Sequence, residues 1–210
     1  MTLLAEQKLF IAGPVGQLEA IWSPTDSNTA RAAVICHPHP LHGGTMGNKV
    51  VTTLARSWRD AGVSVLRFNF RGTGASAGVH DHGVGEADDL LAVLHWLQQQ
   101  GVTELDLAGF SFGSWVAAST VARLPSGLRL GRLVLVAPPV QYEGYGALQP
   151  PPGTLVFQGE EDEVVEAAAV YHWVESRQWV PELLRFAGTG HFFHGRLTDM
   201  KEALLQQLQT

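Results

Sequence analysis

The sequence predicts an α/β protein whose mainly parallel sheet is covered by helices on both faces. Short apolar segments rich in β-branched residues alternate along the chain with segments of helical periodicity. Such alternation is typical of parallel sheets, because the chain must cross back over the sheet before it can pair in parallel. Polar and glycine-rich motifs follow several of the predicted strands. The carboxyl ends of parallel strands meet at one edge, where α/β proteins place their sites.

The first half of the chain is expected to open with a hairpin and continue with strand–helix units. Asn48 can cap a helix, because apolar residues recur after it at spacings of three and four. Acidic residues in the first turn of the next helix complement its dipole. The predicted strands are Lys8–Gly13, Gln17–Trp22, Ala32–His37 and Val63–Phe70, and the second helix runs from about Glu86 to Gln100.

The second half continues the same alternation up to the last helix. Its strands are short apolar runs that end in loops, as buried strands do. The predicted strands are Leu105–Phe110, Leu133–Ala137, Thr154–Gly159 and Glu182–Ala187, and the predicted helices are Phe112–Leu124, Glu166–Arg177 and Gly195–Gln207.

Composition limits the classes of partner. With 210 residues and 45% hydrophobic residues, we expect one globular domain over residues 1–210. The net charge of −6 is spread along the chain, which argues against a nucleic-acid partner and against an anionic membrane surface. Cys36 is the single cysteine, so the fold does not depend on an oxidising compartment. The start at Met1–Glu6 lacks the pattern of a secretory signal, and no apolar run is long enough for a membrane span. We therefore expect a cytoplasmic protein.

The pattern Gly-x-Ser-x-Gly occurs twice, around Ser111 and around Ser76. Its physical content is a sharp turn from strand to helix, with small neighbours around a strained serine. Ser111 meets that context, because a predicted strand ends at Phe110 and a predicted helix follows. Ser76 is followed by residues typical of a loop. Ser111 is therefore the predicted nucleophile, although a plain tight turn is the alternative interpretation.

A serine hydroxyl needs a base to take its proton. Where the serine sits on such a turn, an acid and then a histidine follow it along the chain. His191 lies in a loop after the last predicted strand, so it is the predicted base. His194 is the alternative, and His172 falls inside a predicted helix.

The acid has to orient the imidazole and stabilise its protonated form. Asp162 lies just beyond the predicted strand Thr154–Gly159 and is the predicted acid. Glu160 and Glu161 are open alternatives on spacing alone. Asp199 follows the histidine and falls in the last predicted helix.

Together these segments resemble the α/β-hydrolase superfamily over nearly the whole chain. The matching pieces are Cys36–Met46 after one strand, Phe68–Ser76 after the next, and the segments of Ser111, Asp162 and His191. Within the superfamily, the sequence is similar to the small lidless group related to dienelactone hydrolases. The resemblance implies an eight-stranded sheet without a cap domain and an esterase-like activity. Dienelactone hydrolases have a cysteine nucleophile where this chain has serine, so their substrate is not implied.

Acyl transfer also needs two N–H donors aimed at the developing oxyanion. The residue after the nucleophile, Phe112, supplies one. The loop after Ala32–His37 supplies the other, and its prolines have no N–H, so His39 and Leu41 are the candidates. The family's His-Gly-x pattern favours His39.

Two motifs suggest cofactors, and neither meets its structural context. His37, His39 and His42 share one loop, but no acid joins them, so we expect no metal; a ring bonded to backbone is the simpler interpretation. Residues 72–77 match a dinucleotide fingerprint, yet the next helix begins only near Glu86. We expect no cofactor, and we expect Arg71 to anchor this loop.

The sequence thus predicts a carboxylesterase-like serine hydrolase acting on a small-molecule ester. Lids of the superfamily usually follow the sixth strand, but here residues 138–153 form a proline- and glycine-rich connection. An open site should favour short acyl chains. Phe112, Trp115, Tyr142 and Tyr145 are candidates for a small pocket, or for the core. A thioesterase or peptidase with the same triad, and a non-catalytic binding protein on the same fold, are the alternatives.

Overall fold

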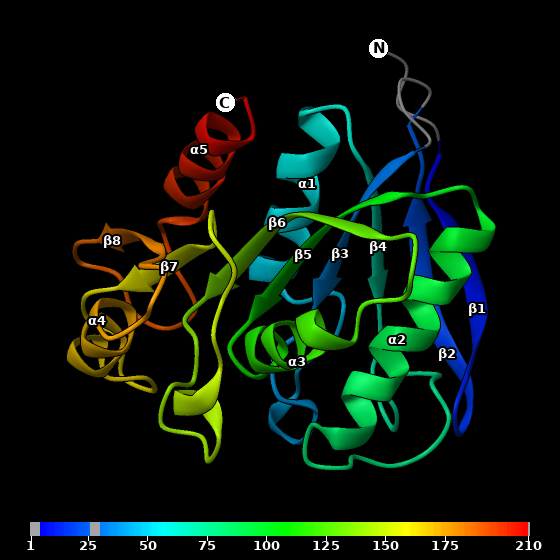
Figure 1. Cartoon of the computed structure of the whole chain (residues 1–210), viewed down its shortest axis with the longest axis horizontal. Helices are drawn as coiled ribbons and strands as arrows, with labels where there is room; N and C mark the ends of the chain where they lie inside the picture. The colour runs from blue at the N-terminus through cyan, green and yellow to red at the C-terminus, as the bar shows by residue number, and fades with distance from the viewer. Residues whose placement is uncertain (1–4, 26–29, 210) are drawn as a thin grey trace.

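The computed structural model describes residues 5–25 and 30–209, and within them eight strands form one twisted sheet (Figure 1). The segment Met1–Leu4, part of the N-terminus assessed for a signal, lies outside the described residues. The strands are β1 (Gln7–Gly13), β2 (Gly16–Ser23), β3 (Arg31–Cys36), β4 (Ser64–Phe68), β5 (Glu104–Phe110), β6 (Arg129–Val136), β7 (Leu155–Gly159) and β8 (Glu182–Phe186).

The strand order is β1-β2-β4-β3-β5-β6-β7-β8. Only β2 runs against its neighbours, because it pairs antiparallel with both β1 and β4, and all the other pairs of the described sheet are parallel. The prediction of a mainly parallel eight-stranded sheet is confirmed. From β3 the chain moves to β4 on one side and later to β5 on the other. This reversal of strand order creates a crevice at the carboxyl ends of β3 and β5.

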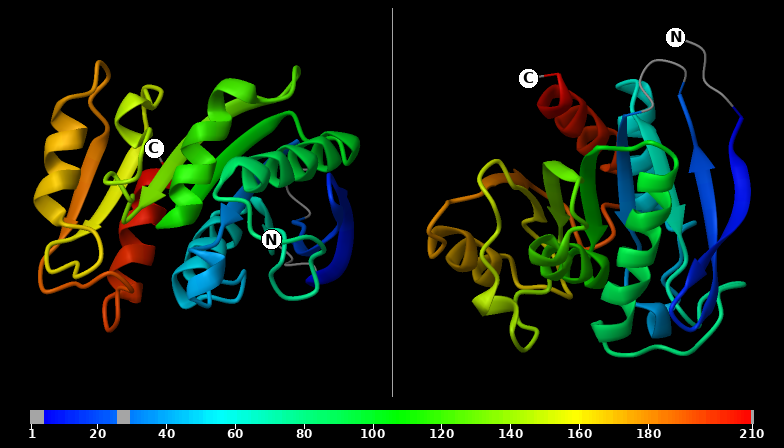
Figure 2. Two further views of the ribbon diagram at one scale, coloured as in Figure 1. Left: turned by 90° about the horizontal axis from the view of Figure 1, so that it is seen from below. Right: turned by 45° about the vertical axis from the view of Figure 1, so that its right-hand side comes forward.

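Helices cover both faces of the sheet, as predicted (Figure 2). One apolar core lies under α1 and α5, and the other lies under α2, α3 and α4. None of these helices is long and apolar enough to cross a bilayer, within the described part of the chain. The helices are α1 (Lys49–Asp60), α2 (Val84–Gln99), α3 (Phe112–Thr120), α4 (Ala167–Glu175) and α5 (Leu197–Leu208).

Of the element ends that differ from the predicted ones, three have identifiable reasons. Helix α2 begins at Val84, because the Glu86 carboxylate turns back to accept the Gly83 N–H at 2.7 Å. Helix α3 ends at Thr120 and passes into a 3₁₀ turn ahead of Pro125, which disfavours helix just before it. Strand β6 begins at Arg129, where half-exposed residues pair with the start of β5.

The connection after β6 carries no cap domain. Residues 137–153 run as turns, and their one helical element is the 3₁₀ turn Tyr145–Ala147. Tyr145 is fully buried and packs edge-on against Trp173 at 5.2 Å, so it belongs to the core and not to a pocket. The carboxyl edge of the sheet is therefore open.

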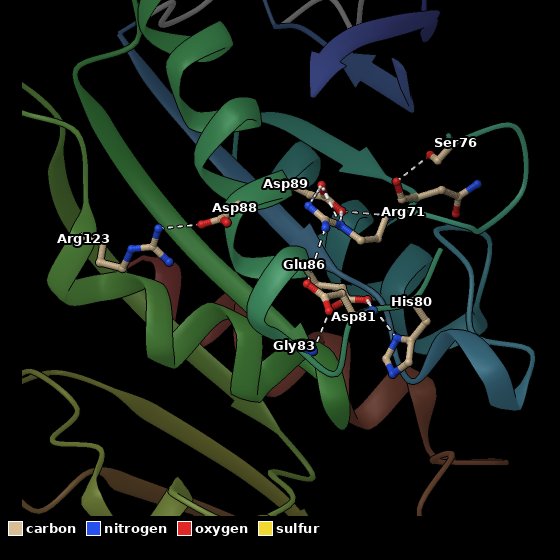
Figure 3. A network of polar contacts seen from close by, with 10 residues as sticks. Arg71, Ser76, His80, Asp81, Gly83, Glu86, Asp88, Asp89 and Arg123 are labelled. Carbon is tan, nitrogen blue, oxygen red and sulfur yellow. Dashed lines mark hydrogen bonds and ion pairs between the residues drawn. The ribbon is translucent and has the colours of Figure 1, made fainter. Parts of the chain in front are cut away.

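The long loop between β4 and α2 is fixed by a buried ion pair (Figure 3). The Arg71 guanidinium donates to both carboxylate oxygens of Asp89 at 2.8–3.1 Å, and the Arg71 N–H donates to the same carboxylate at 2.9 Å. A Cβ on Gly85 would lie 1.9 Å from the guanidinium, so glycine permits this approach. Arg71 anchors the loop, as its position in the sequence indicated.

We expect Asp89→Asn to lower the free energy of unfolding by about 3 kcal/mol, because it leaves a buried guanidinium without its charge partner. The matched control is the neighbouring Asp88→Asn. Asp88 pairs with Arg123, and the two side chains are 43% and 50% exposed, so its loss should cost at most about 1 kcal/mol. Urea unfolding of the two variants measures the difference. Equal losses would contradict the role of the Arg71–Asp89 pair.

Candidate active site

Ser111 occupies a strained turn between β5 and α3. Its backbone has φ 52° and ψ −122°, a region that side-chain-bearing residues rarely adopt. The Ser111 N–H donates to Val136 O at 2.8 Å, and the Ser111 carbonyl accepts from both the N–H and the hydroxyl of Ser114. These bonds hold the backbone on every side, so the hydroxyl is presented at the carboxyl edge of the sheet.

The two glycines around Ser111 are required by close backbone contacts. A Cβ on Gly109 would lie 2.2 Å from the Gly113 carbonyl oxygen. A Cβ on Gly113 would lie 2.4 Å from the carbonyl oxygen of Cys36 on β3. The Gly-x-Ser-x-Gly pattern therefore reports a tight approach of three backbone segments.

His191 and Asp162 meet from two separate loops. Asp162 follows β7, His191 follows β8, and the imidazole Nδ1 lies 2.9 and 3.0 Å from the two carboxylate oxygens. The Asp162 side chain is fully buried and the His191 side chain is 3% exposed. The His191 ring packs on Phe110, at the end of β5, with centroids 5.0 Å apart. With Nδ1 bound to the acid, Nε2 is the nitrogen left for another partner.

The environment of Asp162 favours its ionised form. Burial by itself would raise the pKa of Asp162, but four hydrogen-bonding and charge effects outweigh it. Hydrogen bonds from His191 and Val165 N, the His191 charge, and a bond from Val164 N together hold the pKa below its usual value. The carboxylate is thus prepared to orient an imidazole and to balance its positive charge.

Ser111 and His191 line the same pocket, of about 420 Å³. Within the described residues no hydrogen bond joins the Ser111 hydroxyl to His191; in active sites such bonds often tighten only when substrate binds. His39 also lines this pocket, and its ring packs against Phe112 with centroids 4.9 Å apart. The pocket also takes in Pro38, His42, Gly43, Gly44, Asn48, Gln141, Tyr142, Val164 and Phe192.

The two candidates for the second oxyanion donor differ in what their N–H groups do. The Leu41 N–H donates to the His39 ring at 3.3 Å inside a 3₁₀ turn. No described residue accepts the His39 N–H. Phe112 is the first residue of α3, so its N–H has no acceptor within the helix. These positions keep Phe112 and His39 as the predicted donors.

The alternative residues lie elsewhere. The Ser76 hydroxyl donates to Asn69 O at 2.7 Å and accepts from Glu19 N, so it ties its loop to β2. His194 faces a different hollow, beside Lys49. His172 is exposed on α4. The carboxylate that contacts the His191 ring belongs to Asp162 and not to the neighbouring glutamates.

The histidines of the loop after β3 contact the backbone or one another. His37 is fully buried, accepts the Phe70 N–H at Nε2 and therefore donates from Nδ1 to Pro38 O at 2.7 Å. The His39 ring stacks on His42 with centroids 4.5 Å apart. Among the described residues, no group of three or more His, Cys, Asp or Glu is placed to hold a metal ion.

With this geometry in view, the sequence can be compared with known families. The profile of the family described as serine aminopeptidase, S33, matches residues 29–153, more than half of the chain. The chain belongs to this family of α/β hydrolases. The match covers the strands β3, β4, β5 and β6 and the turn that holds Ser111.

Two solved structures and one curated relative resemble this α/β hydrolase over almost its whole length. An α/β serine hydrolase without a lid from Xanthomonas campestris is 41% identical, with a TM-score of 0.89 over 100% of this chain and 97% of that one. An α/β serine hydrolase homologue from Coxiella burnetii is 42% identical, with a TM-score of 0.90 over 99% and 100%. An uncharacterized protein of Rickettsia prowazekii is 35% identical over 97% of this chain and 89% of its own.

Sequence reasoning missed two residues of this α/β hydrolase that bond to Asp162 and to the His191 backbone. Gln158, buried in β7, donates to an Asp162 oxygen at 3.1 Å. Glu163 accepts the His191 N–H at 3.0 Å, although it is exposed. A polar Gln158 inside an apolar strand was the available signal. No local signal marks Glu163, because it lies in an acidic turn typical of a solvated surface.

His37 should make the stability of this hydrolase fall in mild acid. Burial lowers the pKa of His37 to about 4, although its bond to Pro38 opposes the shift. An unfolded histidine takes up its proton near pH ~6.5, so the unfolded state binds more protons between there and pH 4. The unfolding free energy should therefore drop by roughly 2–3 kcal/mol between pH 7 and pH 4.5 on account of His37.

Urea unfolding of His37→Gln at both pH values measures this contribution. The variant should be less stable at pH 7 and lose roughly 2–3 kcal/mol less on acidification than the wild type. His172→Gln, at an exposed site on α4, is the control and should keep the wild-type pH dependence. Parallel curves for His37→Gln and the wild type would contradict the assignment.

Proposed function

We propose that this protein is a carboxylesterase-like serine hydrolase that cleaves small carboxylic esters through an acyl-enzyme intermediate. The observation that carries the proposal is the Asp162–His191 pair, bonded at 2.9 Å, on the pocket lined by the strained Ser111. We propose Ser111 as nucleophile, His191 as general base and Asp162 as the acid that orients it. Nothing in this chemistry requires a cofactor.

In the acylation half, the Ser111 hydroxyl attacks the ester carbonyl carbon and His191 Nε2 takes its proton. The carbonyl oxygen becomes an oxyanion, which the N–H groups of Phe112 and His39 are proposed to stabilise. The imidazolium then gives its proton to the alkoxide, which leaves as the alcohol. Asp162 stays ionised throughout and balances the imidazolium charge.

In the deacylation half, a water molecule enters in place of the departed alcohol and attacks the acyl group bound to Ser111. His191 takes one proton from the water as its oxygen attacks the acyl carbon. Collapse of the second tetrahedral intermediate breaks the bond to Ser111, and the imidazolium returns the proton to the serine oxygen. The products are one carboxylic acid and one alcohol, and the enzyme is regenerated.

The open carboxyl edge supports small or short acyl groups as substrates. Residues 137–153 form no cap, so nothing in this connection would cover an acyl chain that extends beyond the Ser111 pocket of about 420 Å³. A buried methylene contributes about 0.8 kcal/mol, and an exposed one contributes much less. Thioester or peptide cleavage by the same residues is the nearest alternative, since the family's description names an aminopeptidase. The cytoplasmic location stays a prediction.

We expect Ser111→Ala to lower kcat on 4-nitrophenyl acetate by roughly 10⁴-fold or more, because the nucleophile is lost. Ser76→Ala is the matched control, from the second Gly-x-Ser-x-Gly segment, and should retain activity. A fluorophosphonate probe should label the wild type and Ser76→Ala, but not Ser111→Ala. Retained turnover in Ser111→Ala would disprove the proposed nucleophile, and an unlabelled wild type would favour the non-catalytic binding protein.

The dependence of kcat/KM on the length of the acyl chain tests whether the site is open. On 4-nitrophenyl esters from acetate to palmitate, kcat/KM should stop rising after a few methylenes, because later ones lie in solvent. It should also show no jump at the concentration where the substrate forms micelles. A steady rise to palmitate would mean that another segment covers the acyl chain.

A further inference from the structure

A second hollow of about 640 Å³ adjoins the pocket that contains Ser111. The two cavities share His39, Gln141 and Tyr142, and the residue after Ser111, Phe112, lines the second hollow. Any group placed there is thus continuous with an acyl carbon at the nucleophile. We call this hollow the aromatic pocket; its lining is His39, His80, His82, Phe112, Trp115, Gln141, Tyr142 and Glu143.

Six of these eight lining side chains are rings, and they contact one another in a continuous series. His80 lies 4.8 Å from His39, and His39 lies 4.9 Å from Phe112, between ring centroids. Trp115 meets Phe112 at 5.9 Å and Tyr142 at 5.6 Å, both edge to face. Phe112 is 1% exposed and supports the wall from behind, whereas His39, Trp115 and Tyr142 are half-buried and present ring surface against which a planar aromatic guest packs well.

The loop that carries His80 is fixed before any ligand binds (Figure 3). The fully buried Glu86 carboxylate accepts the N–H groups of Asp81 at 2.9 Å and Gly83 at 2.7 Å. One of its oxygens also lies 2.8 Å from His80 Nδ1, a close contact whose geometry is out of line for a hydrogen bond. Because this wall is already ordered, little conformational entropy is lost when it binds a rigid guest.

The chemistry decides which half of an ester faces this pocket. The imidazole has to protonate the departing oxygen, so the alcohol lies on the His191 side. On that side Phe192 borders a separate hollow of about 360 Å³, which also contains Lys49 and His194. The acyl substituent lies across Ser111, toward Phe112 and the aromatic pocket.

We propose that the aromatic pocket binds a compact planar aromatic acyl group, which makes esters of aryl carboxylic acids the preferred substrate class. Trp115, Tyr142 and His80 determine this preference. The inference rests on the proposed esterase function and narrows its small acyl group to one chemical class.

The test compares acyl groups of equal size on one leaving group. 4-Nitrophenyl benzoate and 4-nitrophenyl cyclohexanecarboxylate have the same ring size, and only the first ring is planar. Each kcat/KM is divided by the rate of hydroxide hydrolysis, which removes the intrinsic reactivity of the ester. The wild type should favour benzoate by about tenfold, the size expected for two aromatic contacts.

Trp115→Leu and Tyr142→Ala should each lower this benzoate preference severalfold. Leucine keeps the apolar contact with the Gly83 turn, where the Trp115 ring packs, and so separates the ring's effect from folding. The control is Trp179→Leu, at a tryptophan that is 57% exposed and lines none of these pockets. It should keep the wild-type ratio, and a thermal melt of each variant checks its fold.

Failure of this inference is distinguishable from failure of the proposed function. If the acetate ester is cleaved and Ser111 is labelled, but benzoate and cyclohexanecarboxylate are used equally, the aromatic pocket is not an acyl site. A preference that is the same in folded Trp115→Leu and Tyr142→Ala would also overturn the inference. If no ester is cleaved and Ser111 is not labelled, the proposed function itself is wrong.

Discussion

The close approach of three backbone segments at the β5–α3 turn is the constraint on which the rest of the candidate site depends. Gly113 packs against the carbonyl of Cys36, and Gly109 packs against Gly113, at distances that no Cβ would permit. This packing draws the loop after β3 beside the start of α3. His39 from that loop therefore lines the same pocket as Ser111, whose backbone has a positive φ. The strained Ser111 turn and the loop that carries the proposed donor His39 thus meet in one packing arrangement.

Around that turn, the loops have little regular secondary structure and are held by hydrogen bonds to buried polar side chains. Long loops follow β3 and β4, yet each is tied down by a buried group that accepts backbone N–H bonds. His37 holds the first loop to Phe70, Asp89 holds Arg71, and Glu86 holds the residues before α2. Because an unsatisfied buried group is costly, these bonds leave each loop with few alternative conformations. Rigid loops at the crevice are what a binding site without a lid requires, since no cap can order them later.

The different placements of Tyr145 and Tyr142 explain why the site is open on one side and lined by aromatic rings on the other. In the connection after β6, Tyr145 packs in the core against Trp173 and so does not cover Ser111. Tyr142, three residues earlier, turns instead toward Trp115 and completes a wall of rings. The cavity that results is bordered by side chains of α3 and of three loops. Substrate selection by the proposed triad would depend on these walls, because acyl transfer by a serine, a histidine and an acid is the same for every acyl group.

The sequence by itself determined the alternation of strands and helices, the Asn48 cap and the mainly parallel sheet, because periodicity and capping residues leave local signals. Glycine spacing and chain order also predicted Ser111, Asp162 and His191 as the triad, with Glu160 and Glu161 left open as alternatives to Asp162. The tertiary structure alone decided which carboxylate reaches the imidazole, since Glu160, Glu161 and Asp162 are equivalent on spacing. It also decided the contact of Glu163 with His191 and the neighbours of His80, which join residues far apart in the chain. Local patterns fix conformation, whereas contacts between loops depend on how the sheet twists and where each strand ends.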